Sequence, residues 1–295
     1  MKTLVNTKLN NKALSILMAL GLLIFLGSCG DDDNELDIED QTLEEISEDV
    51  DFETEAGAEN VLEDLENVTE AGMDAINAGG RTLEDELLDC ATVTHDEENK
   101  TVTIDYGDGC EGPGGRLRQG KLIITYTDRR LVPGAVKTVV PEDFYVDSVK
   151  VEGTRIVTNI MESEEDVPKF RIELISGRLT FPDETTFTRD AEHTRTWIRG
   201  ANPRLDETIR EGEASGTDRD GNTYRVEILE PIVYKRSCGF LPVSGIKQIT
   251  VNGGEHVIVY DYGDGRCDNL VTVTIDGRTE EIEINPRRFK FRRRG

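Results

Sequence analysis

The sequence predicts an antiparallel all-β protein with one amphipathic helix near its N-terminus. Two observations lead to this prediction. After residue 90, the chain forms many short segments in which apolar and polar residues alternate, and turn residues separate these segments. One stretch before residue 80 instead has the three-and-four spacing of apolar residues that is typical of a helix. The pattern does not distinguish between a bent sheet, a sandwich and an open barrel.

Residues 1–28 have the composition of a secretory signal peptide. Three lysines, Lys2, Lys8 and Lys12, precede an uncharged segment that is shorter than the roughly 20 apolar residues of a membrane span. The segment ends in Leu26-Gly27-Ser28-Cys29, which resembles the bacterial lipobox. This resemblance implies cleavage before Cys29 and lipidation of its sulfur, so we expect the protein to contact the membrane through a lipid anchor.

Residues 29–57 form an acidic tether. Its first residues, Gly30-Asp31-Asp32-Asp33-Asn34-Glu35, resemble the export tract of surface lipoproteins of Bacteroidetes. The resemblance implies an outer-membrane, lipid-anchored and surface-exposed protein. The alternative is a periplasm-facing anchor in which the tract is only a solvated spacer, because such acidic segments bury too little apolar surface to order themselves.

Residues 58–80 are predicted to form the helix. Its apolar residues Val61, Leu65, Val68 and Ile76 lie near one face, and its opposite face is acidic. Gly79-Gly80 is a typical helix end. We expect the apolar face to cover part of the sheet, since an isolated helix of this length is marginal in water. The alternative is a helix that docks a partner protein.

Residues 81–286 are predicted to form the β domain, and residues 287–295 a basic tail. The β domain contains the following candidate strands, apart from those in the two hairpins described below with the cysteines: 121–126, 136–140, 144–151, 154–160, 170–175, 177–181, 185–189, 194–198, 208–214 and 223–228. The short connections favour antiparallel neighbours. The tail is either a solvated end or a binding segment for the protein's own acidic surface or for an anionic glycan.

The cysteines are predicted to form two disulfides. Segments 91–95 and 101–106 are typical of one hairpin, and segments 246–251 and 256–260 flank Asn252-Gly253-Gly254, a strong turn signal, in a second. Four cysteines besides Cys29 allow three pairings, and these hairpins favour Cys90–Cys110 and Cys238–Cys267. The cysteines lack the close C-x-x-C spacing of a metal site. We predict no metal and no cofactor.

An internal repeat accompanies these hairpins. Residues 103–110 (TIDYGDGC) recur as residues 259–267 (VYDYGDGRC). Glycine and aspartate favour turns at both places. The competing interpretation is a calcium site, built either from the carboxylates of the repeat or from the loop 218–222 (DRDGN). The sequence of this loop is also that of an ordinary hairpin turn.

The sequence contains no catalytic motif, so we predict a non-enzymatic protein. It has no G-x-S-x-G, P-loop or G-x-G-x-x-G, and its three histidines lack metal-ligand spacing and are expected to be exposed on strands. We expect the single tryptophan, Trp197, to be a core residue rather than a sugar-stacking surface. The net charge of −26 becomes −29 without the three leader lysines, which argues against nucleic acid, and against anionic lipid headgroups beyond the anchor itself, as partners.

The lipobox, the acidic tract and the ending YGDGRCDN at residues 262–269 resemble uncharacterised Bacteroidetes outer-membrane lipoproteins. The resemblance implies a β-rich, lipid-anchored envelope protein and no known activity. Our leading hypothesis is a surface binding, adhesion or structural module with a protein or glycan partner. The alternative is a carrier of an apolar or lipidic ligand in a concave β groove.

Overall fold

A computed structural model describes residues 52–78, 87–112, 115–239 and 241–283. They all belong to the compact unit Gln41–Gly295. This part of the chain contains one α-helix, α2 (Phe52–Ala78), and one antiparallel sheet of fourteen strands. The predicted all-β class with one N-terminal helix is therefore confirmed.

The strands follow one another along the sheet as a meander. Their bounds are β1 (Thr92–Asp96), β2 (Thr101–Asp105), β3 (Cys110–Glu111), β4 (Leu117–Tyr126), β5 (Val136–Val146), β6 (Val149–Asn159), β7 (Lys169–Thr180), β8 (Thr186–Ile198), β9 (Glu207–Thr217), β10 (Thr223–Lys235), β11 (Leu241–Val251), β12 (His256–Asp264), β13 (Leu270–Ile275) and β14 (Arg278–Glu283). Each strand pairs with the next, except that β2 pairs with β4 and the short β3 pairs only with β4.

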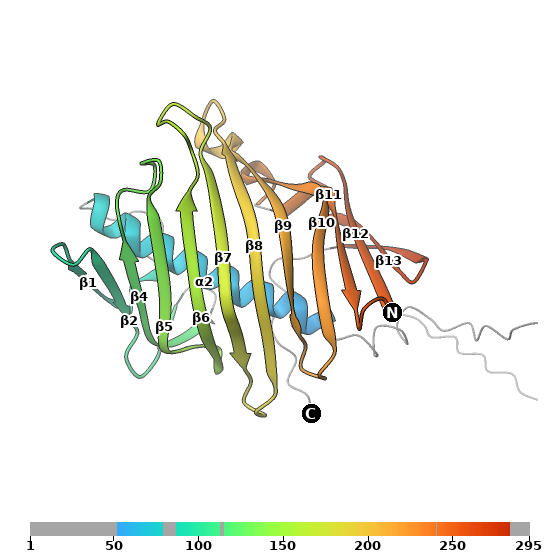
Figure 1. Cartoon of the computed structure of the whole chain (residues 1–295), viewed down its shortest axis with the longest axis horizontal. Helices are drawn as coiled ribbons and strands as arrows, with labels where there is room; N and C mark the ends of the chain where they lie inside the picture. Colours follow the sequence, from blue (N-terminus) through green and yellow to red (C-terminus); the bar gives the residue numbers. More distant parts are fainter. Residues whose placement is uncertain (1–51, 79–86, 113–114, 240, 284–295) are drawn as a thin grey trace, which may run out of the picture. The chain divides into compact units, whose positions relative to one another are not determined.

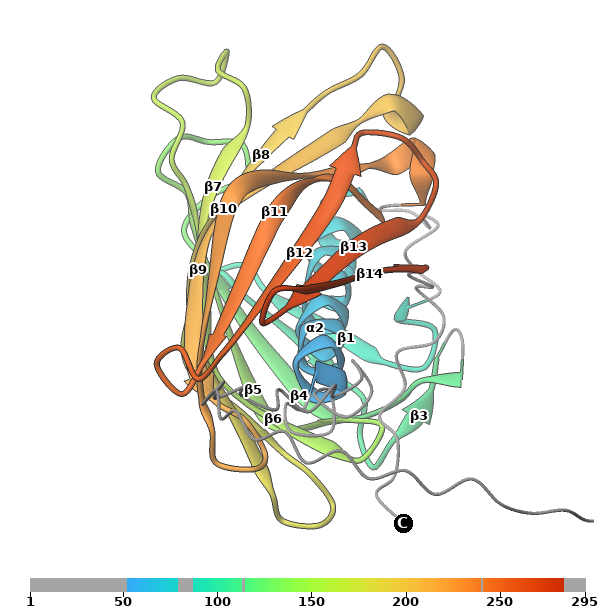
Figure 2. The same ribbon diagram turned by 90° about the vertical axis from the view of Figure 1, so that its right-hand side faces the viewer.

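The sheet is open and strongly bent. Its strands curve around α2, which crosses them on the concave side (Figures 1 and 2). β-Bulges interrupt the register between most neighbours from β4 to β12, and bulges increase local twist and bending. At Gly120, where φ is +82°, a Cβ atom would overlap the carbonyl oxygen of Asp143 on the next strand. Only glycine allows this close approach in the bend.

Three strand predictions were wrong in their boundaries. Residues 144–151 contain the turn between β5 and β6, because Asp147 and Ser148 both adopt positive φ. The segments 170–175 and 177–181 instead form the single strand β7, in which Ile175 and Ser176 are a bulge. The segments 185–189 and 194–198 likewise form the single strand β8. Polar and small residues signalled turns there, although the neighbouring strands continue the pairing.

The apolar face of α2 packs on the sheet, as predicted. Val61, Leu65 and Val68 are buried in the main core, together with residues of the concave face that include Val102, Ile104, Leu122, Ile124 and Phe144. Gly72 lets the helix approach β2, because a Cβ atom there would collide with the side chain of Ile104. Ile76 is partly buried against the same core.

The helix is longer than predicted at its N-terminal end. It begins at Phe52, so residues 52–57 belong to α2 and not to the tether. The sequence of residues 52–57 contains no proline and includes glutamate and alanine, which are good helix formers, so the helix extends through this segment. The helix ends at Ala78, and the predicted terminator Gly79-Gly80 lies outside the described residues.

Both predicted disulfides are present. Cys90 and Cys110 connect the start of the sheet to β3, with a Cα–Cα distance of 6.0 Å. Cys238 and Cys267 connect the ends of β10 and β12, with a Cα–Cα distance of 5.3 Å. The disulfides therefore close the two copies of the repeat at separate places in the sheet.

Candidate functional site

The concave face carries an arc of positive charge, although the protein as a whole is acidic. Successive residues of a strand point to opposite faces. In β8, for example, Arg189, His193 and Arg195 share the concave face with the buried Phe187. We call the following set the cationic arc: Arg116 directly before β4, Arg118 in β4, Lys137 in β5, Arg155 in β6, Arg189, His193 and Arg195 in β8, Arg210 in β9 and Lys247 in β11.

The acidic residues of α2 face this arc. Glu59, Glu66 and Glu70 recur at helical spacing of seven and four residues, so they share one face of the helix. Each carboxylate pairs with cations from two places in the chain: Glu59 with Arg189 and Lys247, Glu66 with Arg155 and Arg195, and Glu70 with Arg130 and Lys137. The acidic face therefore binds the sheet of its own chain, which was not predicted from the sequence.

The most buried of these contacts joins Asp64 to Arg118. The Nε atom of Arg118 donates to Oδ2 of Asp64 at 2.9 Å, and Nη2 donates to Oδ1 at 2.6 Å. Arg118 is 1% exposed. Arg116 approaches the same carboxylate at 3.3 Å. Such a bidentate pair stabilises the position that the helix has above β4 in this structure.

The ion pairs keep the helix carboxylates charged. Burial by itself raises the pKa of Glu70, but Lys137 and Arg130 outweigh it and lower the pKa to about 2. Burial and the opposing charges of Lys247, Arg189 and Arg210 likewise leave the pKa of Glu59 at about 2. Both groups stay ionised in the folded protein at pH values where an unfolded chain would protonate them.

We expect these carboxylates to make the fold sensitive to acid. Each has a lower pKa in the folded than in the unfolded chain, so the stabilisation is complete above about pH 5 and is lost as the pH falls towards 2. Urea unfolding at pH 7, 5 and 3 measures this loss. Glu70→Gln should flatten the dependence below pH 5. An unchanged acid dependence in this variant would contradict the assignment to Glu70.

Several nitrogen atoms in the arc have no partner. Among the described residues, no hydrogen-bond partner is available to the buried atoms Nη1 of Arg155, Nε2 of His193, Nη2 of Arg195 and Nε of Arg210. Burial, followed by the charges of Arg210, Arg155 and Arg189, lowers the pKa of His193 well below its usual value. The expectation that the strand histidines are exposed is thus wrong for His193, because the bend of the sheet encloses its face.

The remaining histidines and Trp197 have ordinary polar partners. His95 Nε2 lies 2.6 Å from the hydroxyl of Tyr126, and His256 Nδ1 lies 2.7 Å from Asp276. Trp197 is partly buried, and its Nε1 donates to Asp206 at 3.0 Å. The guanidinium groups of Arg130 and Arg199 lie over the Trp197 ring.

The carboxylates considered for calcium form turns and ion pairs instead. Asp105 and Asp261, at equivalent places in the repeat, each accept a hydrogen bond from the glycine two residues later. In the loop 218–222, Asp218 accepts from the backbone of Asp220 and Asn222. Within the ranges that the structure covers, no three His, Cys, Asp or Glu side chains form a group that could hold a metal ion.

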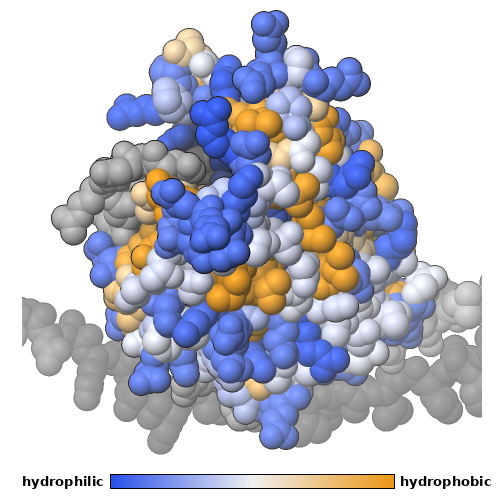
Figure 3. All heavy atoms as spheres, turned by 60° about the vertical axis from the view of Figure 1, so that its left-hand side comes forward, coloured by the Kyte–Doolittle hydropathy of each residue, from blue (hydrophilic) through white to orange (hydrophobic). Residues whose placement is uncertain are grey.

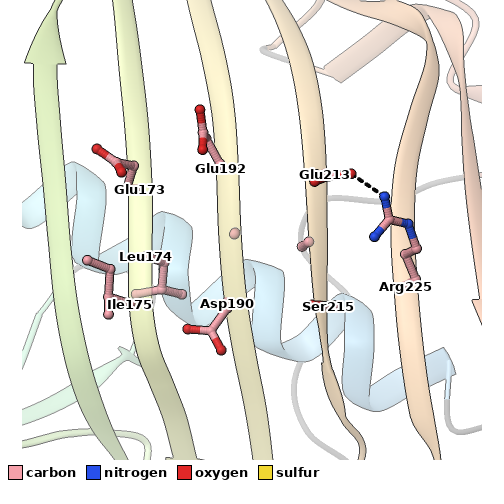
Figure 4. A pocket seen from close by; sticks show the side chains of 10 residues that line it. Glu173, Leu174, Ile175, Asp190, Glu192, Glu213, Ser215 and Arg225 are labelled. Carbon is pink, nitrogen blue, oxygen red and sulfur yellow. Dashed lines mark hydrogen bonds and ion pairs between the residues drawn. The ribbon is translucent and has the colours of Figure 1, made fainter.

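The convex face has a shallow polar depression of about 260 Å³. Glu173, Asp190, Glu192 and Glu213 contribute carboxylates to it, and Arg225 is its only lining cation (Figure 4). α2 lies behind the strands in this view, so the depression and the cationic arc are on opposite faces. Apolar residues are also exposed among polar ones elsewhere on the surface (Figure 3). The depression brings together none of the residues singled out in the sequence.

The lipidation candidate, Cys29, and the basic tail at 287–295 lie outside the described residues. No described helix is long and apolar enough to cross a membrane. No family model, curated protein or solved structure matches the chain. The case for a function therefore rests on the residues themselves.

Proposed function

We propose that the chain is a non-enzymatic, lipid-anchored protein of the outer membrane with a surface binding or structural role. The observation that carries the proposal is the use of the cysteines. Four of the five form the disulfides Cys90–Cys110 and Cys238–Cys267. Cys29, at the end of the lipobox-like sequence, is left without a cysteine partner in its own chain and is available for a thioether bond to lipid.

Two further observations support the proposal. Disulfides persist mainly in oxidising compartments outside the cytosol, as expected for a secreted chain. In this structure α2 fills the concave face and is held there by ion pairs, so the face is not an open apolar groove. The convex depression, with its carboxylates on an open surface, has no adjacent histidine or cysteine in its lining.

Mass spectrometry of the protein from a lipoprotein-processing host tests the anchor. We expect the mature chain to begin at Cys29 with a diacylglyceryl modification, and Cys29→Ala to abolish both the added mass and membrane association. Protease treatment of intact cells separates a surface-exposed from a periplasm-facing orientation. An uncleaved leader with an unmodified Cys29 would overturn the proposal.

A further inference from the structure

The cationic arc has more positive charge near β8 and β9 than α2 neutralises. Arg195 and Arg210 are direct cross-strand partners, and like charges in this position repel each other. Glu66 pairs with Arg155 and Arg195. Arg210 contacts the ring of Tyr234, but no described carboxylate lies within ion-pair distance of it. Tyr234, Glu59 and Glu63 nevertheless outweigh the burial of Arg210 and raise its pKa, so these carboxylates stabilise its charge without an ion-pair contact.

The unpaired nitrogen atoms occur in the same region. They belong to neighbouring strands, with Arg155 in β6, His193 and Arg195 in β8 and Arg210 in β9. A buried donor without an acceptor is destabilising. Unsatisfied buried polar groups are expected at sites that serve a function other than the stability of the protein. All four groups would gain acceptors from an anion.

An apolar patch adjoins these cations. Val157, Phe170 and Ile172 form a buried cluster of their own, separate from the main core. Ile172 is the cross-strand partner of His193, and Phe170 is the partner of Arg195. The concave face therefore has a short apolar cluster, buried in this structure, that is bordered by positive charge.

We propose that this part of the concave face binds an anionic amphiphile, with a phosphate or carboxylate head and an apolar chain, and that α2 moves aside to admit it. The head accepts hydrogen bonds from Arg155, His193, Arg195 and Arg210, while the chain covers the patch around Phe170. The inference rests on the binding role proposed above, for which it names a ligand class, but it uses neither the lipid anchor nor the cellular location.

Two features of α2 support its displacement. Among the described residues, no backbone hydrogen bond joins α2 to the sheet, so only side chains hold it in place. Its surface also has the chemistry of the proposed ligand, since it presents an apolar face to the core and carboxylates to the arc. The unpaired donors are covered in this structure, so a ligand reaches them only when the helix moves.

The test uses the full secreted chain with Cys29→Ala, which cannot be acylated. The probes are decyl phosphate and decanoate below their micellar concentrations, decyl maltoside as a neutral amphiphile and inorganic phosphate as a head without a chain. Calorimetry should show at least tenfold tighter binding of one or both anionic amphiphiles than of the two control probes. Equal binding of decyl maltoside, or no binding of either anionic amphiphile, would overturn the proposal.

Arg210→Met separates a ligand-binding role from a structural one. Because no described carboxylate makes an ion-pair contact with Arg210, its removal should change the unfolding midpoint little, while binding of the anionic probe weakens about tenfold or more. Arg225→Met, on the convex face, is the matched control and should not change binding. Loss of stability with unchanged binding in Arg210→Met would contradict the proposal.

A reversible lock tests the movement of α2. A Cβ atom at position 72 would contact the side chain of Ile104, so Gly72→Cys with Ile104→Cys places two thiols close enough to form a disulfide. The oxidised variant should lose binding of the anionic probe, and mild reduction should restore it. Equal binding by the oxidised and reduced forms would exclude displacement of α2. The failure of either binding test leaves the result for Cys29 lipidation unaffected.

Discussion

Replacing Asp64 with leucine is expected to lower the free energy of unfolding by about 3–5 kcal/mol. The carboxylate accepts two hydrogen bonds from Arg118, which is 1% exposed. Its removal leaves a guanidinium group buried without its counter-ion, and this cost exceeds the net strength of the original pair. Urea unfolding monitored by far-ultraviolet circular dichroism and by Trp197 fluorescence measures the change.

A double variant distinguishes the cost of an unpaired charge from the strength of the pair. Asp64→Leu with Arg118→Leu removes both charges, so it should recover most of the lost stability. Glu213→Gln is the control for an exposed pair: Glu213 and Arg225 are both about half exposed, and their loss should cost at most about 1 kcal/mol. A cost below 1 kcal/mol for Asp64→Leu alone would show that Arg118 has another partner available.

The parts of the fold that depend on local sequence were predictable. The turn at Asn252-Gly253-Gly254 and the alternation on either side of it predict the β11–β12 hairpin, which the structure contains. Because a hairpin also fixes which residues lie opposite one another, the same reasoning predicted both disulfides. The apolar residues of α2 at spacing of three and four indicated the face that packs on the sheet.

The cationic arc could not be predicted in the same way. Its members are distributed from Arg116 to Lys247, and only the bend of the whole sheet brings them around one helix. The sequence indicated that α2 has an acidic face, but an acidic helix face is most often solvated. A weak signal was present in β8, where Arg189, His193 and Arg195 occupy the positions that the alternation assigns to the buried side.

The errors in strand length have a related cause. Ser176 and Gly177 have the composition of a turn, yet Ser176 lies in a bulge inside β7 and Gly177 continues the strand, because β6 and β8 continue on both sides. Gly153 on β6 lies against Gly177, where a Cβ atom would be 2.8 Å from the Cα atom of Gly177. Facing bulges of this kind bend the sheet around α2. Whether such residues form a turn or a bulge depends on the neighbouring strand, which local composition does not specify.

Phe144→Ala should be the most destabilising single change in the apolar core, at about 3–5 kcal/mol. Phe144 is 0% exposed and its ring lies 6.0 Å from that of Tyr106. The cavity left by the phenyl group cannot collapse easily, because β4 and β6 hold β5 on both sides. Val140→Ala in the same strand is the control: its side chain is 42% exposed, so the change should be within about 0.5 kcal/mol. Similar midpoints of urea unfolding for the two variants would mean that this end of β5 lies outside the cooperative core, and the helix would then depend on its ion pairs alone.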